Sequence, residues 1–262
     1  MLDWFYSFTN LQIGATVFVS GLSVTTLAPY VVRRLFNLEP SDDVAKGAEE
    51  SLKILISLIM LLLAFCLVRM QGDHRSAEDL VSREAAVMLK LDRSYKAFGG
   101  EVGSKLHGDL VQYANAVVND EWKLLAKGES LEAAEVLLDG MGRESKQLDP
   151  QTPAQLVARS EVIQSFNQLS DLHDARISAS RLKLPTYYWN AIVSALVFFT
   201  LFGWLHGPRS KQMAFVGGVT CGLCLLLTML IATSGIFSGE SAVTSEPIQK
   251  AIKSLEKNAP PK

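Results

Sequence analysis

The sequence places one acidic residue, Glu84, inside the apolar stripe of a predicted helix, because its neighbours three and four positions away are all apolar. Those neighbours are Leu80, Val81, Val87 and Met88. A later predicted helix carries Arg176, together with His173, in a stripe of the same kind. A buried carboxylate is stable only beside a basic or hydrogen-bonding partner. The chemistry predicted here is therefore a buried ion pair between Glu84 and Arg176.

Helix geometry allows Glu84 and Arg176 to meet. Glu84 lies fifteen residues beyond Arg69, roughly 22 Å of helix from a predicted membrane end. Arg176 lies eleven residues before Tyr187, roughly 16 Å from the next membrane end. The two helices run in opposite directions, so the two side chains reach similar heights. Two roles stay open: a structural ion pair, or a titrating switch or ion site.

Two cysteines have the spacing of a redox motif, Cys221-Gly222-Leu223-Cys224. Some four-helix, quinone-linked thiol oxidases place such a pair in a last membrane span, but they also need shuttle cysteines in a watery loop. The remaining cysteine, Cys66, lies in another hydrophobic run, and thiolates are unfavourable in lipid without a nearby cation. We therefore expect the cysteines to act as small packing residues.

No other residues show the spacing of a catalytic, metal or phosphate site. The four histidines are scattered, and the turn at Gly99-Gly100 lacks the preceding strand and following Lys-Ser/Thr of a phosphate loop. No nucleophile and base are arranged together. We therefore expect no enzyme activity, no cofactor and no metal ion. The net charge of −2 gives no reason to expect nucleic acid as a partner.

The elements that must position these residues are membrane spans and soluble helices. The chain has 262 residues, 48% of them hydrophobic, and gathers its apolar residues into four charge-free runs. These runs are Trp4–Val32, Ile54–Val68, Leu184–Pro208 and Gln212–Gly239. Three of them exceed the roughly 20 residues that a span needs. The second is shorter, and Lys53 and Arg69 at its ends can extend their charges to the two interfaces.

The second run leads directly into a soluble helix. We predict one long helical stretch over 51–98, with at most a kink at Gly72 and an end at Gly99-Gly100. Further helices are predicted over 105–126, 131–138 and 154–182. Gly140 and Gly142 are expected to stop the second of these. No alternating strand pattern occurs, so the predicted fold class is all-α.

We expect four parts in the chain. Residues 1–72 form a first transmembrane hairpin, and 73–183 form an antiparallel helical soluble domain inserted between spans two and three. Residues 184–239 form a second transmembrane hairpin, and 240–262 form a polar C-terminal tail. With four spans, both termini and the soluble domain share one side of the membrane, and the basic residues do not assign that side.

The spans carry features of helix packing and of a pore. Gly218 and Gly222 have the spacing that lets two membrane helices approach closely. The span interiors contain no Asp, Glu, Lys or Arg, which argues against a voltage sensor or a proton-coupled transporter. Ile54, Ile56 and Ile59 are candidates for a hydrophobic constriction.

A set of short motifs follows the order of the predicted helices. Its members are Glu84-Ala85 after the second span, Tyr113 and Glu121-Trp122 one helix later, then Arg176, Arg181, Pro185 and Trp189 leading into the third span. This set resembles the bestrophin-like domain family of mostly bacterial membrane proteins, over about residues 10–235. The resemblance implies two helical hairpins around a helical soluble domain, and a location in the bacterial inner (cytoplasmic) membrane.

Analogy to true bestrophins further implies a ring of identical subunits that conducts inorganic ions through a pore lined by the second span. True bestrophins carry an acidic calcium-binding cluster and an aromatic-rich neck, and the sequence contains neither. Two functions stay open. One is a homo-oligomeric ion channel. The other is a non-conducting, membrane-anchored scaffold or sensor whose soluble helical bundle binds a partner. Both have the lipid membrane as a partner.

Overall fold

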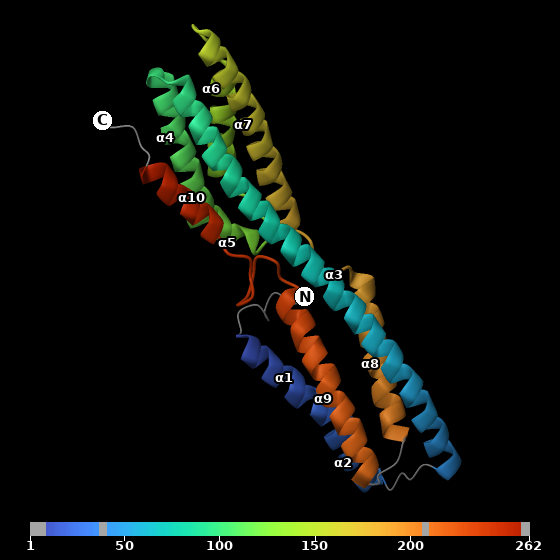
Figure 1. Ribbon diagram of the computed structural model, residues 1–262. Coiled ribbons are helices and arrows are strands. Elements are labelled where there is room, and N and C mark those ends of the chain that lie inside the picture. The colour runs from blue at the N-terminus through green and yellow to red at the C-terminus, as the bar shows by residue number, and fades with distance from the viewer. Residues whose placement is uncertain (1–8, 37–40, 206–209, 258–262) are drawn as a thin grey trace. The chain divides into compact units, whose positions relative to one another are not determined.

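The computed structural model describes residues 9–36, 41–205 and 210–257, and every regular element in these ranges is a helix (Figure 1). The helices separate into two compact units. The first contains the described residues up to Gly72, with Lys183–Gly235 and Gly239–Ser241. The second contains Asp73–Leu182 and Ile236–Ser238, with the described residues from Ala242 onward.

The first unit holds the membrane spans. Its elements are α1 (Asn10–Leu22), the π-helical turn η2 (Ser23–Leu27), α2 (Ala28–Phe36), the first part of α3 (Asp42–Phe98), α8 (Thr186–Leu205) and α9 (Ser210–Thr233). Four helical stretches among the described residues are long and apolar enough to cross a membrane. This confirms the predicted number of spans, although the predicted run ends at Trp4 and Pro208 lie outside the described residues. A side-chain capping box of Thr9 and Gln12 begins α1.

Helix α3 belongs in part to each unit and is unbroken from Asp42 to Phe98. It begins nine residues before the predicted start and passes Gly72 without interruption. It ends, as predicted, where Gly99 and Gly100 adopt positive φ angles of 73° and 71°. Its part in the second unit carries Glu84 and forms one wall of that unit's core.

The second unit is a helical bundle. Its elements are the rest of α3, α4 (Gly100–Ala116), the π-helical turn η3 (Val117–Glu121), α5 (Trp122–Leu125), α6 (Glu132–Lys146), α7 (Pro153–Ser180) and α10 (Glu246–Lys257). The predicted stop of the 131–138 helix was wrong, because α6 continues to Lys146 through Gly140 and Gly142. A Cβ atom at Gly142 would lie 2.7 Å from the ring of Phe166. This glycine therefore permits close packing of α6 against α7 and does not end the helix.

The C-terminal region packs into the same bundle. Helix α10 buries one apolar face, made of Ile248, Ala251, Ile252 and Leu255. The short segment after α9 adds Ile236 and Phe237 to the core, and the amide of Val243 donates a hydrogen bond to the carbonyl of Ile236. The C-terminal region, predicted to be a polar tail, thus contributes apolar side chains to the core of the second unit.

Candidate functional site

The structure brings Glu84 of α3 and Arg176 of α7 together in the second unit. Arg176 Nε donates to Glu84 Oε2 over 2.6 Å, and Nη2 donates to Oε1 over 3.1 Å. Both side chains are fully buried. This two-pronged geometry matches a guanidinium to a carboxylate, which makes the pair strong and directional.

Three further polar side chains complete a buried group. Arg176 Nη2 also lies 3.1 Å from Glu121 Oε2 and 3.2 Å from His173 Nδ1. The hydroxyl of Tyr113 donates to Glu84 Oε1 over 3.2 Å and lies 3.0 Å from His173 Nδ1. We call Glu84, Tyr113, Glu121, His173 and Arg176 the charged cluster. All five side chains are buried, and they come from α3, α4, η3 and α7.

His173 contacts polar groups of the charged cluster through both ring nitrogens. Its Nδ1 lies within hydrogen-bond distance of Arg176 Nη2 and of the Tyr113 hydroxyl. Its Nε2 lies 3.8 Å from Glu121 Oε1. The carboxylates of Glu84 and Glu121 both face the single guanidinium of Arg176.

Burial and neighbouring charges shift two other groups in the charged cluster. Burial raises the pKa of Tyr113 well above its ordinary value, and the adjacent Glu84 carboxylate raises it further, against an opposing effect of Arg176. Burial disfavours the Arg176 guanidinium, but the charge and hydrogen bonds of Glu84 prevail and raise its pKa. Tyr113 therefore stays a hydroxyl donor and Arg176 stays charged.

Two aromatic residues extend the charged cluster. The guanidinium carbon of Arg176 lies 5.6 Å from the centroid of the Trp122 ring, a cation–π distance. Trp122 in turn meets Phe237 edge to face, with ring centroids 5.6 Å apart. Arg176 Nη1 is buried and has no hydrogen-bond partner among the described residues, so the ring of Trp122 is an important neighbour of this cation.

The stripe pattern that predicted Glu84 also applies to the next helical run. Leu106, Leu110, Tyr113, Val117, Glu121 and Leu125 are all buried and recur at spacings of three and four. Glu121 and Tyr113 entered the sequence argument only as family motif residues, although this periodicity places both on the core face. The π-helical turn η3, a local feature common at functional sites, holds Glu121 at its last position.

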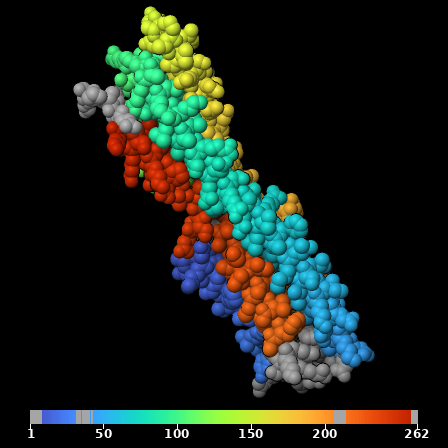
Figure 2. All heavy atoms as spheres, in the orientation of Figure 1, coloured from blue at the N-terminus to red at the C-terminus, as the bar shows by residue number. Residues whose placement is uncertain are grey.

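The three pore candidates occupy different faces of α3. The side chain of Ile54 is 66% exposed, that of Ile56 is partly buried, and that of Ile59 is only 1% exposed. Figure 2 shows side chains of the membrane part of α3 uncovered along one face, beside those of α9. Ile59 packs inside the membrane unit, so Ile54 is the candidate on the open face.

The glycine pair of α9 makes no tight contact with the described part of the chain. There, a Cβ atom at Gly218 would meet nothing within 4 Å, and one at Gly222 would lie 3.9 Å from Met60. The close helix contact lies instead at Gly21 of α1, where a Cβ atom would lie 2.5 Å from the sulfur of Cys224. Packing at Gly218 and Gly222 against another subunit stays a prediction.

The remaining motif residues lie apart from the charged cluster. Arg181 Nε donates to the carbonyl of Gly128 over 3.0 Å and so holds a loop of the second unit. Pro185 directly precedes α8, and Trp189 packs against the core of the first unit. Among the described residues, no group of three or more His, Cys, Asp or Glu side chains is arranged to hold a metal ion.

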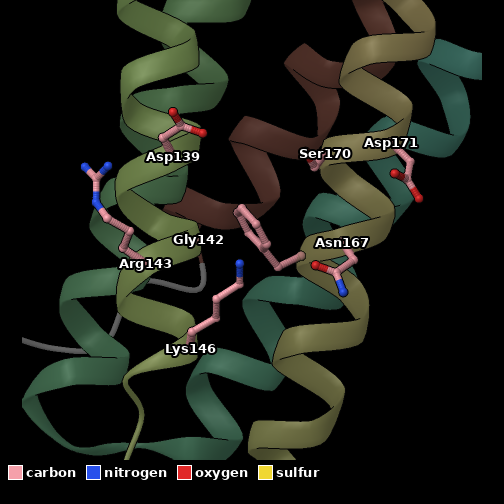
Figure 3. Close-up of a pocket in the computed structure, with 8 residues that line it drawn as sticks. Asp139, Gly142, Arg143, Lys146, Asn167, Ser170 and Asp171 are labelled. Atoms are coloured by element: carbon pink, nitrogen blue, oxygen red, sulfur yellow. The ribbon is translucent and has the colours of Figure 1, made fainter.

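The second unit also has a polar groove of about 460 Å³ between α6 and α7 (Figure 3). Arg143 and Lys146 line it from α6, and Asn167 and Asp171 line it from α7. All four side chains are exposed, and Arg143 and Asp171 extend away from each other. The groove is thus a solvent-facing surface with charges of both signs.

These features define an all-helical integral membrane protein with an ionic cluster buried in its second unit. Residues 18–248 match the model of the bestrophin-like domain, and the chain belongs to this family. A comparison with curated proteins found no match.

Solved structures show the same fold. A bacterial bestrophin homolog from Klebsiella pneumoniae aligns over 94% of this chain and 96% of its own, with 12% identity and a TM-score of 0.66. A single-residue variant of a bestrophin homolog from the same organism aligns over 96% of this chain and 97% of its own, with 11% identity and a TM-score of 0.67. At this identity the likeness concerns the fold alone.

Proposed function

We propose that the chain assembles into a homo-oligomeric, bestrophin-like ion channel in the bacterial inner membrane. Four spans form two hairpins, the helical domain is inserted between spans two and three, and the membrane part of α3 from each subunit lines the pore. Membership of the bestrophin-like domain family and the fold shared with bacterial bestrophin homologs support this proposal. The observation that carries it is the uncovered face of α3.

That face has the pattern expected of a helix surrounded by copies of itself. Its large apolar residues are Ile54, Leu58, Leu61, Phe65 and Val68, all exposed in the single subunit. They alternate at spacings of four and three, the seven-residue repeat by which helices associate around a common axis. Such a face contains no charge, and a pore that it lines would be gated by exclusion of water.

The central test is ion flux through liposomes that contain only this protein. Leu61→Ser should raise the flux severalfold over wild type, because a hydroxyl lets water wet an apolar constriction. Leu201→Ser is the matched control: it makes the same change at an exposed position of α8. Equal flux from the two variants, in folded and oligomeric protein, would show that Leu61 does not line the pore.

Ile54 and Ile59 refine the same test. Ile54→Ser lies on the uncovered face and should raise flux, whereas Ile59→Ser lies in the packed interior and should lower the thermal midpoint instead. A rise in flux from Ile59→Ser without a change in stability would mean that a different face of α3 lines the pore.

The alternative function is a non-conducting scaffold or sensor. It is favoured by Leu156 and Val157, two exposed apolar side chains near the start of α7, and by the charged groove between α6 and α7. Both features suit a protein partner at the second unit. Absence of flux from wild type and from Leu61→Ser and Ile54→Ser, in folded and oligomeric protein, would favour this function.

A further inference from the structure

Two adjoining hollows form one groove in the membrane unit, between α1, η2, α8 and α9. Their volumes are about 360 Å³ and about 250 Å³. Val24, Leu196 and Thr200 line both, which makes the groove continuous. Along α8 its lining runs from Val193 to Trp204, roughly 16 Å of helix. One leaflet of a bilayer, half of a hydrocarbon core of about 30 Å, has nearly this depth.

The groove is lined by apolar side chains and by hydroxyls whose protons are already donated within the protein. Among the described residues, no charged side chain contributes to the lining. The hydroxyls of Thr25, Thr200 and Thr220 each donate to the backbone carbonyl four residues earlier, in every case over 2.8 Å. Since these donors are satisfied inside the protein, an occupant needs only apolar surface.

The outer rim of the groove faces away from the protein. Val24, Val193, Val197 and Leu201 are each about half exposed and continue the apolar surface of α8. Water in an apolar hollow at this depth would lack hydrogen-bond partners. A helix from a second subunit would require small residues for close approach, whereas the rim of α8 is formed by branched side chains. A flexible hydrocarbon chain needs no hydrogen-bond partners and can fit between branched side chains.

The backbone explains why the groove exists at this position. The π-helical turn η2 interrupts the first span, and the indole of Trp204 donates to the carbonyl of Val24 over 3.2 Å. This contact holds η2 against the end of α8. Tryptophan is typical of the membrane interface, so Trp204 marks the end of the groove where a lipid headgroup would lie.

We propose that this groove binds an acyl chain of a membrane phospholipid, inserted lengthwise with its headgroup end near Trp204. The length of the lining, its apolar chemistry and its continuity with the lipid-facing surface identify this occupant. The site goes beyond the proposed channel, because it requires neither a pore nor ion flux.

The test places the photo-crosslinking residue p-benzoylphenylalanine at Val197 in the full chain, in vesicles of phosphatidylethanolamine and phosphatidylglycerol. Mass spectrometry should find a lipid adduct at this residue. Val24→Phe fills the groove and should reduce the adduct severalfold. Val19→Phe makes the same change on the exposed surface of α1, outside the groove lining, and should leave the adduct unchanged.

Two results would overturn the proposal. An adduct unaffected by Val24→Phe would mean that lipid only touches the outer surface of α8. A covalent dimer formed from position 197 would mean that a second subunit fills the groove. If Val24→Phe does not fold, Thr200→Phe fills the same groove from α8 and carries the same expectation.

Discussion

The two units satisfy their buried polar groups in different ways. In the membrane unit, hydroxyls bond mostly to carbonyls of their own helix, and the hydroxyl oxygens of Thr220 and Thr25 also lie 3.0 Å apart across two helices. In the second unit, charged side chains 92 and 55 residues apart, Glu84–Arg176 and Glu121–Arg176, bond directly. The membrane helices therefore depend mainly on close packing of their surfaces, whereas the bundle of the second unit depends on a few charged side chains, none of which can be removed singly.

The largest expected effect tests that dependence. Arg176→Met removes the only guanidinium of the charged cluster and leaves the carboxylates of Glu84 and Glu121 buried without it. Breaking such a pair costs roughly 3–5 kcal/mol. The thermal midpoint of the purified protein, followed by circular dichroism, should fall strongly.

Companion variants separate the pair from the whole cluster. Glu84→Gln/Arg176→Met should recover part of the loss, and adding Glu121→Gln should recover more, because each step removes an orphan charge. Strictly additive losses would show that these residues do not interact. Ion flux from a stable multiple variant then distinguishes a structural cluster, which leaves function intact, from a switch, which would be locked in one state.

The extent to which the sequence predicted the fold and the charged cluster differs between the two units. Apolar runs were sufficient to predict the membrane helices, since crossing lipid requires length and hydrophobicity. The apolar stripes placed Glu84 and Arg176 on the core-facing sides of their helices. Periodicity within one helix, however, does not show which side chains of the other helices contact a buried residue. Gly142 shows the opposite failure, because local propensity predicted a helix stop where the ring of Phe166 requires a residue without a side chain.

The next largest effect tests shape in the membrane unit. Gly21→Ala would place a methyl group against Cys224 and should destabilise the protein by about 1–3 kcal/mol through overpacking. Gly218→Ala is the matched control, because its methyl group would meet no described atom of the chain within 4 Å. Loss of oligomer from Gly218→Ala would instead place that glycine at a subunit interface.

A smaller effect appears only at alkaline pH. A tyrosine in the unfolded chain ionises near pH 10, whereas burial keeps the folded-state pKa of Tyr113 well above that. The stabilising difference is fully present below pH 10 and is lost as the pH rises toward the folded value, by about 1.4 kcal/mol per pH unit. Tyr113→Phe should therefore show a shallower fall in thermal midpoint above pH 10. Parallel curves for wild type and variant would contradict this reading.

The smallest effect is expected when an arginine of an exposed ion pair is replaced, for comparison with the same replacement in the charged cluster. Arg83 bonds Asp79 one turn away on α3, with Nε 2.8 Å from Oδ2, but both side chains are exposed. Water and salt screen such a pair, so Arg83→Gln should leave the thermal midpoint within error of wild type. Arg176→Gln, the identical substitution in the charged cluster, should lower it by many degrees at any salt concentration, because its partners are shielded from solvent. Similar losses from the two variants would mean that burial does not set the strength of these pairs, and the contrast between surface and core would fail.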